Sequence, residues 1–151
     1  MLWCESEGTP GVPFRQDFAQ SARRHLRAAQ RLHESDLSGD QPGCRAVAGY
    51  LFGLAGELAF KEMMRASGMR PLPADRRADD PFWQHFPTIR TLIIQMASGR
   101  RQRELWTLAQ DPNLFQNWDI AMRYGKTCDI REEWVSAWQR SAEQLVERMA
   151  L

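Results

Sequence analysis

Cysteine and lysine are both scarce in this sequence of 151 residues. The three cysteines, Cys4, Cys44 and Cys128, are odd in number, widely separated and never in a C-x-x-C spacing. This pattern argues against a disulfide framework and a structural zinc site, and it fits a reducing cytoplasm. Because Lys61 and Lys126 are the only lysines, arginine carries nearly all of the positive charge. Arginine favours contacts with phosphate or carboxylate, although GC-rich coding would produce the same bias.

The motifs of several large enzyme classes are also missing. The sequence has no P-loop, no G-x-G-x-x-G, no H-E-x-x-H and no G-x-S-x-G. Its three histidines include no E-x-x-H pair, which argues against a ferritin-like di-iron centre. We therefore expect no metal and no other cofactor. A net charge of +1 gives no overall attraction to nucleic acid or to a membrane.

No long hydrophobic run is present, because Glu57 and Lys61 interrupt the most apolar stretch. We therefore expect no transmembrane helix and no membrane association. The first residues, MLWCESEG, have neither a basic region nor an apolar core, so we expect no signal peptide and a cytoplasmic protein. Residues 1–13, with their prolines and glycines, predict a flexible leader, and residues 14–151 predict a single domain.

The sequence does contain helical periodicity. No segment of strand length alternates apolar and polar residues with a period of two. Helices are predicted at about 17–34, 45–67, 114–124 and 129–149. A further helix is predicted from Pro87 to a break at Ser98–Gly99, and a basic helical segment continues from there to residue 110. Short breaks at glycine and proline favour antiparallel neighbours. The sequence thus predicts an all-α, up-and-down bundle of four main helices with one or two short extra helices.

The helix expected at 45–67 is apolar on nearly all sides, which places it in the middle of the bundle. Gly49, Gly53 and Gly56 fall on one stripe of it. A glycine costs about 1 kcal/mol at each position inside a helix. We therefore expect a neighbouring helix to pack very closely against this stripe.

A second stripe of the same helix carries Tyr50, Glu57 and Lys61. Glu57 and Lys61 are four residues apart in the order that favours an ion pair. Charges on a buried helix are costly unless they are paired. Two interpretations stay open: a structural ion pair at a helix crossing, or the floor of a polar pocket in which Lys61 meets an anion and Glu57 orients it.

Three further groups are candidates for a site. His85 lies in an aromatic cluster just before a helix, and it becomes functional only if it faces Lys61 or Arg123. Asp119 and Arg123, next to Tyr124, form either a local salt bridge or part of a site at a helix end. Arginines 23, 27 and 31 share one side of the first helix, as a solvated basic face or a phosphate-facing ridge.

The segment GYLFGLAGELAFK, residues 49–61, resembles the second helix of the HEPN family of small helical-bundle proteins. The similarity extends to His85 before the next helix and to Arg123–Tyr124 before the last one, over roughly residues 17–147. It implies a bundle that often dimerises and is often tied to RNA. Many members are metal-independent ribonucleases, or partners of nucleotidyltransferases in toxin–antitoxin and defence systems.

The sequence lacks the catalytic motif of that family, which is an arginine followed four to six residues later by a histidine, late in the chain. Arg123 is followed by YGKTCD, and the spacing match of Arg27 with His33 lies in the first helix, where the family has no site. We therefore expect a non-catalytic, homodimeric binding or regulatory module for RNA or a nucleotide. Its ligand site would contain Glu57, Lys61, His85, Asp119, Arg123 and Tyr124.

Two other hypotheses stay open. One is a divergent ribonuclease in which His85 transfers the proton and Arg123 stabilises the phosphorane. The other is a structural dimerisation or interaction protein with no ligand site, in which the tryptophans and glycines serve only the core and a dimer seam.

Overall fold

The computed structural model describes residues 13–40 and 43–150, and this part of the chain is helical with no strand. The prediction of an all-α fold is thus confirmed. Three helices are long: α1 (Phe18–Ser38), α2 (Cys44–Ala66) and α5 (Glu132–Met149). Two are short: α3 (Thr88–Met96) and α4 (Arg103–Gln110). The connections contain the 3₁₀ helices η1 (Ala74–Asp79), η2 (Pro81–Trp83), η3 (Arg100–Gln102), η4 (Ile120–Tyr124) and η5 (Thr127–Asp129).

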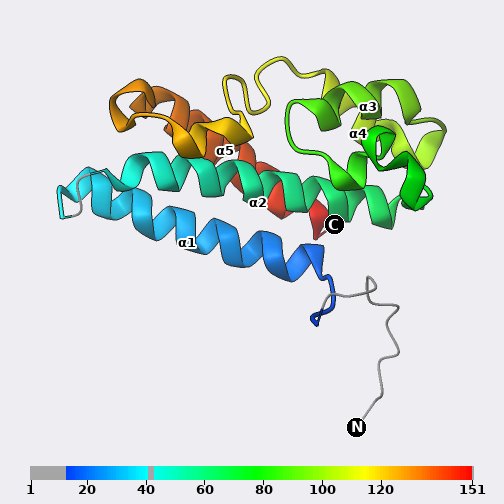
Figure 1. Ribbon diagram of the computed structural model, residues 1–151, viewed down its shortest axis with the longest axis horizontal. Helices are drawn as coiled ribbons and strands as arrows, with labels where there is room; N and C mark the ends of the chain where they lie inside the picture. Colours follow the sequence, from blue (N-terminus) through cyan, green and yellow to red (C-terminus); the bar gives the residue numbers. More distant parts are fainter. Residues whose placement is uncertain (1–12, 41–42, 151) are drawn as a thin grey trace, which may run out of the picture.

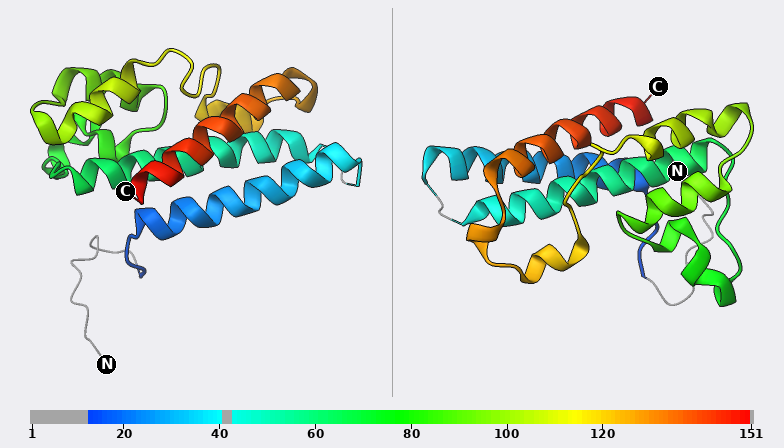
Figure 2. Two further views of the ribbon diagram at one scale, coloured as in Figure 1. Left: turned by 180° about the vertical axis from the view of Figure 1, so that it is seen from behind. Right: turned by 90° about the horizontal axis from the view of Figure 1, so that it is seen from above.

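Helix α2 lies at the centre of the fold (Figure 1). Helix α1 packs antiparallel along one side of it, and α5 packs along another side in the same general direction as α2 (Figures 1 and 2). Helices α3 and α4 lie together near the C-terminal end of α2. The helix predicted from Pro87 to residue 110 is thus divided into α3 and α4, and the break falls at Ser98–Gly99 as expected.

The start of α1 and the end of α2 follow the sequence signals, whereas α1 continues to Ser38 rather than ending at about 34. Asp17 caps α1, its carboxylate accepting a hydrogen bond from the Gln20 backbone amide at 2.9 Å. After α2, Gly68 has a φ of 92° and its amide donates to the Arg65 carbonyl oxygen. Such a left-handed glycine is the usual way for a helix to end, which explains why this boundary was predictable.

The packing of the three α2 glycines differs from the expected close approach of a helix. A Cβ on Gly53 would lie 1.9 Å from Cε2 of Trp118, and one on Gly56 would lie 2.1 Å from Cζ of Phe115. Only Gly49 faces a helix, through the Trp138 ring of α5. Two of the glycines therefore make room for aromatic rings from the loop between α4 and η4.

That loop is where the prediction of secondary structure was wrong. A helix was expected at 114–124, but residues 114–117 form turns and only Ile120–Tyr124 is helical, as the 3₁₀ helix η4. Phe115 and Asn117 have positive φ angles of 51° and 69°. Docking of the Phe115 and Trp118 rings against α2 outweighs the local helix preference of the segment. Helix α5 likewise begins at Glu132 rather than at Asp129, which lies in η5.

Two expectations concern other parts of the chain. The leader predicted for residues 1–13 lies outside the described residues apart from Pro13. Within residues 13–40 and 43–150, no helix combines the length and the apolar character needed to cross a membrane.

Candidate functional site

The buried charged pair on α2 has a third member from the connection before α3. The Lys61 ammonium donates to Oε2 of Glu57 at 3.3 Å, and Nδ1 of His85 lies 2.6 Å from Oε1 of the same carboxylate. Glu57 and Lys61 are only 4% and 6% exposed. Both oxygens of one buried carboxylate are thus engaged, one by a lysine and one by a histidine.

His85 connects this buried group to solvent, since 47% of its side chain is exposed. Nδ1 is the ring nitrogen that Glu57 engages. No hydrogen bond joins Nε2 to any residue in the described part of the chain. The arrangement fixes the orientation of the ring and leaves Nε2 without a partner among the described residues.

The connection before α3 holds His85 in place through two buried neighbours. The Asp80 carboxylate is fully buried and accepts hydrogen bonds from the backbone amides of Leu72 at 2.8 Å and Phe82 at 3.0 Å. Phe86 stacks on Phe115 with ring centroids 5.1 Å apart. These contacts anchor the backbone on both sides of His85, so the histidine reaches Glu57 from an ordered segment.

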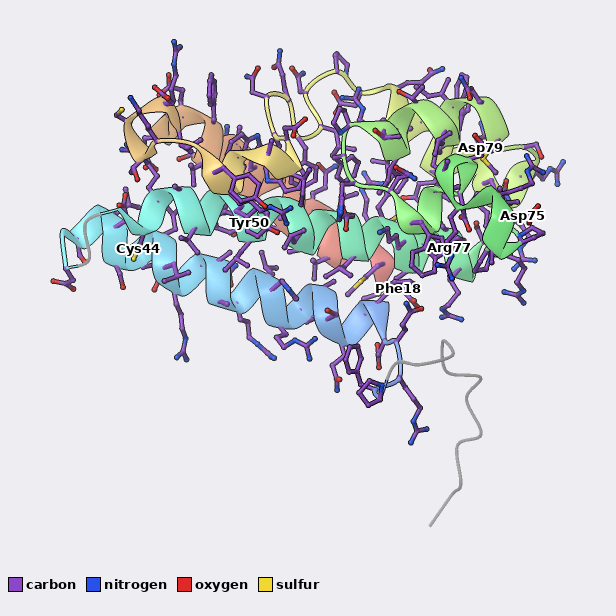
Figure 3. The ribbon with its side chains drawn as sticks, viewed as in Figure 1. Phe18, Cys44, Tyr50, Asp75, Arg77 and Asp79 are labelled. Atoms are coloured by element: carbon purple, nitrogen blue, oxygen red, sulfur yellow. The ribbon has the colours of Figure 1, made fainter. Side chains whose placement is uncertain are left out.

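Arg123 belongs to a second group, farther toward the N-terminal end of α2. A hydrogen bond with Tyr50 raises the pKa of Arg123 above its ordinary value, and Tyr124 contributes in the same direction. The guanidinium also lies 4.8 Å from the centroid of the Tyr124 ring. Tyr50 in turn stacks on Trp118, with centroids 6.2 Å apart, and Figure 3 shows it on α2 beside the segment that holds η4.

Asp119 does not pair with Arg123 in the described structure. Its carboxylate accepts a hydrogen bond from the Ala121 backbone amide at 2.8 Å and so caps η4. In a 3₁₀ helix the side chains at i and i+3 are the ones that eclipse, so residues four apart are not aligned as they are in an α-helix. The structural role of Asp119 is thus to begin the turn that carries Arg123 and Tyr124.

The contacts of the candidate residues with α2 fall into two groups, and no contact joins the two groups in the described part of the chain. Arg123 contacts Tyr50, whereas His85 contacts Glu57 seven residues later on α2. Seven residues correspond to about 10 Å along a helix axis. The structure thus brings together Glu57, Lys61 and His85 in one group, and Arg123 and Tyr124 with Tyr50 in another.

One feature of these groups was not predicted. The contact of Tyr50 with Arg123 joins residues from α2 and η4, and the sequence offered only the position of Tyr50 on the same stripe as Glu57. The arginines 23, 27 and 31 of α1 are exposed, as both interpretations of them required. Among residues 13–40 and 43–150, no group of three or more histidine, cysteine or acidic residues is placed to hold a metal ion.

Comparisons with known proteins gave no match to a family model, to a curated protein or to a solved structure. The functional argument for this protein therefore starts from its own side chains.

Proposed function

We propose that this protein is a non-catalytic RNA-binding module of the HEPN-like type, which holds single-stranded RNA at Arg123 and Tyr124. The observation that carries the proposal is the exposure of Tyr124, at 80%, with the Arg123 guanidinium over its ring. Proteins that bind single-stranded nucleic acid stack bases on exposed aromatic rings and contact the backbone with cations. A ring so exposed contributes little to the core, which favours a role in recognition.

The surroundings of Tyr124 support a site that is organised before RNA binds. The Arg123 guanidinium lies 4.8 Å from the centroid of the Tyr124 ring, and its pKa is raised by Tyr50, whose own ring is stacked on the buried Trp118. Lys126, two residues after Tyr124, is exposed and adds a second cation. Ordering a side chain in advance reduces the entropy lost on binding. A base stacked on Tyr124 would thus have its phosphates beside Arg123 and Lys126.

The alternative of a ribonuclease that uses His85 and Arg123 together is less well supported. The residues of α2 that these two side chains contact are about 10 Å apart along the helix axis, and no contact joins His85 to Arg123 in the described part of the chain. Proton transfer requires hydrogen-bond reach, about 2.6–3.2 Å between heavy atoms. The accessible Nε2 of His85 is nevertheless the group to test if cleavage is observed.

Fluorescence anisotropy with short labelled single-stranded RNAs tests the proposal. We expect Tyr124→Ala to weaken binding about 5- to 150-fold, the effect of losing one base–aromatic stack, and Tyr124→Phe to bind like the wild type. Arg123→Gln is also expected to weaken binding. Its matched control is Arg27→Gln, which removes the same charge from the exposed face of α1.

Two results would refute this site. One is binding by Tyr124→Ala equal to that of the wild type, and the other is an equal loss in Arg27→Gln and Arg123→Gln, which would indicate unspecific attraction to arginine. RNA cleavage that disappears in His85→Ala would replace the proposal with the ribonuclease. Absence of RNA binding by the wild type at low salt would favour a structural interaction protein.

The resemblance also motivates proposals about partners and location. We propose that the protein forms a homodimer, is found in the cytoplasm, and acts with a nucleotidyltransferase in a toxin–antitoxin or defence system. Light scattering on the purified protein tests the first point, since a mass of 17.5 kDa would mean a monomer. Co-purification with the product of a neighbouring nucleotidyltransferase gene tests the last.

A further inference from the structure

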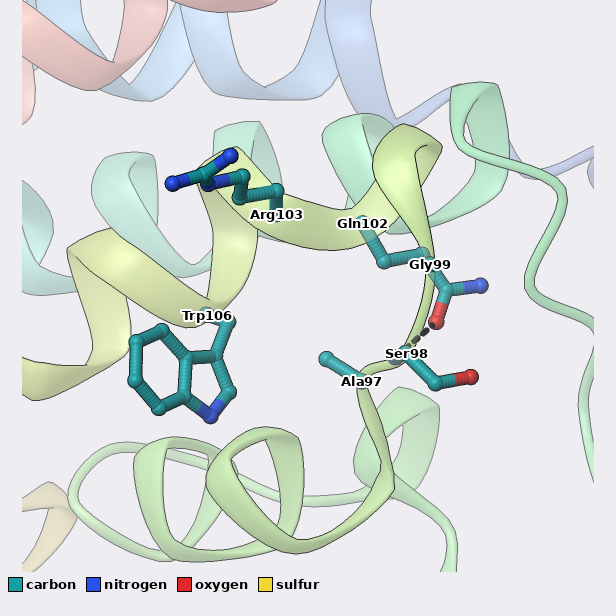
Figure 4. Close-up of a pocket in the computed structure, with 6 residues that line it drawn as sticks. All are labelled: Ala97, Ser98, Gly99, Gln102, Arg103 and Trp106. Carbon is teal, nitrogen blue, oxygen red and sulfur yellow. Dashed lines mark hydrogen bonds between the residues drawn. The ribbon is translucent and has the colours of Figure 1, made fainter.

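Outside the two groups of candidate residues, polar side chains gather in two places. One is an open hollow between the turn after α3 and the start of α4, where they diverge. In Figure 4 the Arg103 guanidinium and the Trp106 indole lie on opposite sides of α4, and a hydrogen bond between Ser98 and Gln102 lies at another edge. The other place is the contact between α1 and α5, where polar side chains converge on the ring of His33. This residue is only 4% exposed, so both of its ring nitrogens depend on partners within the protein.

Both ring nitrogens of His33 face oxygen atoms of α5. Nε2 lies 2.5 Å from Oε1 of Glu132, and Nδ1 lies 2.8 Å from Oε1 of Gln139. On the α2 side the ring meets Phe52 edge-on, with centroids 5.8 Å apart. In the described part of the chain, no ion pair or hydrogen bond joins His33 to α2. The polar partners of this buried ring therefore all come from α5.

The surrounding side chains determine which end of Gln139 faces the ring. Its Nε2 donates to Oε1 of Glu143 at 2.8 Å, and Gln30 of α1 donates to the same oxygen at 3.2 Å. An ionised carboxylate only accepts hydrogen bonds, so the reversed amide would set its oxygen against that of Glu143. Oε1 of Gln139 is thus held toward Nδ1 of His33 as an acceptor.

Glu132 supplies the second acceptor and a route to solvent. Its Oε1 also accepts a hydrogen bond from Oγ of Ser136 at 3.2 Å, and 36% of its side chain is exposed. On α1 itself, Glu34 is exposed, and Asp36 accepts a hydrogen bond from the Arg45 backbone amide. A neutral imidazole has one donor and one acceptor nitrogen, whereas two acceptors face the ring of His33. A neutral ring would therefore leave one buried nitrogen facing an oxygen with no proton between them.

We propose that His33 holds α1 against α5 as a doubly protonated imidazolium, and that loss of one proton loosens this contact. Nε2–H then donates to Glu132 and Nδ1–H to Gln139. As the pH rises, the proton passes to water beside the exposed part of Glu132, one of the two hydrogen bonds is lost, and a buried acceptor stays unpaired.

The direction of the effect follows from which state is stabilised. The folded protein pairs the charged ring and the unfolded chain does not, so the stabilisation is complete at low pH and is lost as the pH rises through the deprotonation of His33. Histidine is the side chain that ordinarily changes charge between about pH 5 and 8. This link between α1 and α5 is independent of RNA binding at Tyr124.

Nitrogen NMR of the histidine rings in the full chain tests the protonation state. The chain has three histidines, and the His33 signals are those missing in His33→Gln. At about pH 5.5 both His33 nitrogens should carry a proton, and the loss of one at higher pH should move the amide signals of α1 and α5 in step. Glu132→Gln keeps an oxygen acceptor but removes the negative charge, so its His33 should lose the proton at a lower pH. A ring with a single proton throughout about pH 5–8, or an unchanged titration in Glu132→Gln, would overturn the proposal.

Urea unfolding at about pH 5.5 and about pH 8.5 measures what the link contributes to stability. Over this range the unfolding equilibrium constant of the wild type should rise about tenfold more than that of His33→Gln, the lower end of the effect of one hydrogen bond to a charged group. If His33→Gln does not fold, Glu132→Gln supplies the same comparison.

The matched control is His25→Gln, which removes a histidine from the same helix. Nδ1 of His25 lies 2.7 Å from the Ser21 carbonyl oxygen, within α1, so this variant should keep the pH dependence of the wild type. Hydrogen exchange should place the loss of protection at high pH in α1. Equal pH dependence of the wild type and His33→Gln, or an equal change in His25→Gln, would contradict the proposed link.

Discussion

Replacing Gly53 by alanine tests the packing of α2 most directly. The added Cβ would lie 1.9 Å from Cε2 and 2.0 Å from Nε1 of Trp118. These are inner atoms of a ring that is 2% exposed and that donates a hydrogen bond to the Gly49 carbonyl oxygen at 3.1 Å. Stacking on Tyr50 fixes the ring further. The indole therefore has to leave its position for the methyl group to fit.

Three effects determine the size of the change. Overpacking of a core costs about 1–3 kcal/mol. Loss of the indole hydrogen bond costs about 0.5–1.5 kcal/mol. Alanine returns about 1 kcal/mol, because it is a better helix former than glycine. We therefore expect Gly53→Ala to lower the free energy of unfolding by about 2 kcal/mol and the melting temperature by about 4–8 °C.

Urea unfolding followed by circular dichroism measures this difference, with Gly49→Ala as the control. At Gly49 the nearest atom to a Cβ is the outer Cζ3 of Trp138, at 2.9 Å. Trp138 is also buried and donates to the Gln116 carbonyl oxygen at 2.7 Å, but the shift it needs is smaller than that of Trp118, and the same gain in helix propensity applies. Gly49→Ala should thus lose less stability than Gly53→Ala. A Gly53→Ala protein as stable as Gly49→Ala would refute the assignment of the glycine stripe to the Trp118 ring.

Three further stability predictions use the same urea measurement. Glu57→Ala leaves the buried Lys61 charge without its carboxylate and should lower the free energy of unfolding by about 3–5 kcal/mol. The double variant Glu57→Leu with Lys61→Met removes both charges and should leave the stability nearly unchanged. Equal losses in the two proteins would contradict this account of the pair. The Arg90 guanidinium donates to three backbone carbonyl oxygens around the end of α4, so Arg90→Ala should cost about 2 kcal/mol and Arg90→Lys somewhat less. Asp80→Ala removes the acceptor for two backbone amides and should cost about 2 kcal/mol, with an unchanged midpoint contradicting the role of Asp80 as an anchor.

The parts of the fold that the sequence predicted are those set by neighbouring residues. Asp17 begins α1 and Gly68 follows the end of α2, because capping depends on a few residues close in the chain. The central position of α2 was likewise predictable, since a helix with apolar residues on most sides has to be covered on most sides. Ser98–Gly99 separated α3 from α4 for the same local reason.

The parts that were missed depend on contacts between distant segments. The segment 114–124 has helical spacing, yet Phe115 and Trp118 fill gaps opposite two glycines about sixty residues earlier, and the backbone follows those rings. The contacts of the candidate residues depend on the same kind of long-range packing. The positions of Glu57 and Lys61 on α2 followed from the sequence, whereas the points where the connections carrying His85 and Arg123 return to α2 did not.

The geometry of Glu57 argues against an anion site at Lys61. A carboxylate with one oxygen on Lys61 and the other near His85 leaves the lysine charge neutralised and almost fully buried. Taking a second anion into that position would require breaking a buried ion pair, which is strongly unfavourable. Arg123, in contrast, lies beside the exposed ring of Tyr124 and pairs with no carboxylate of the described structure. For this reason the central pair is assigned to stability, and RNA binding is proposed at Arg123 and Tyr124.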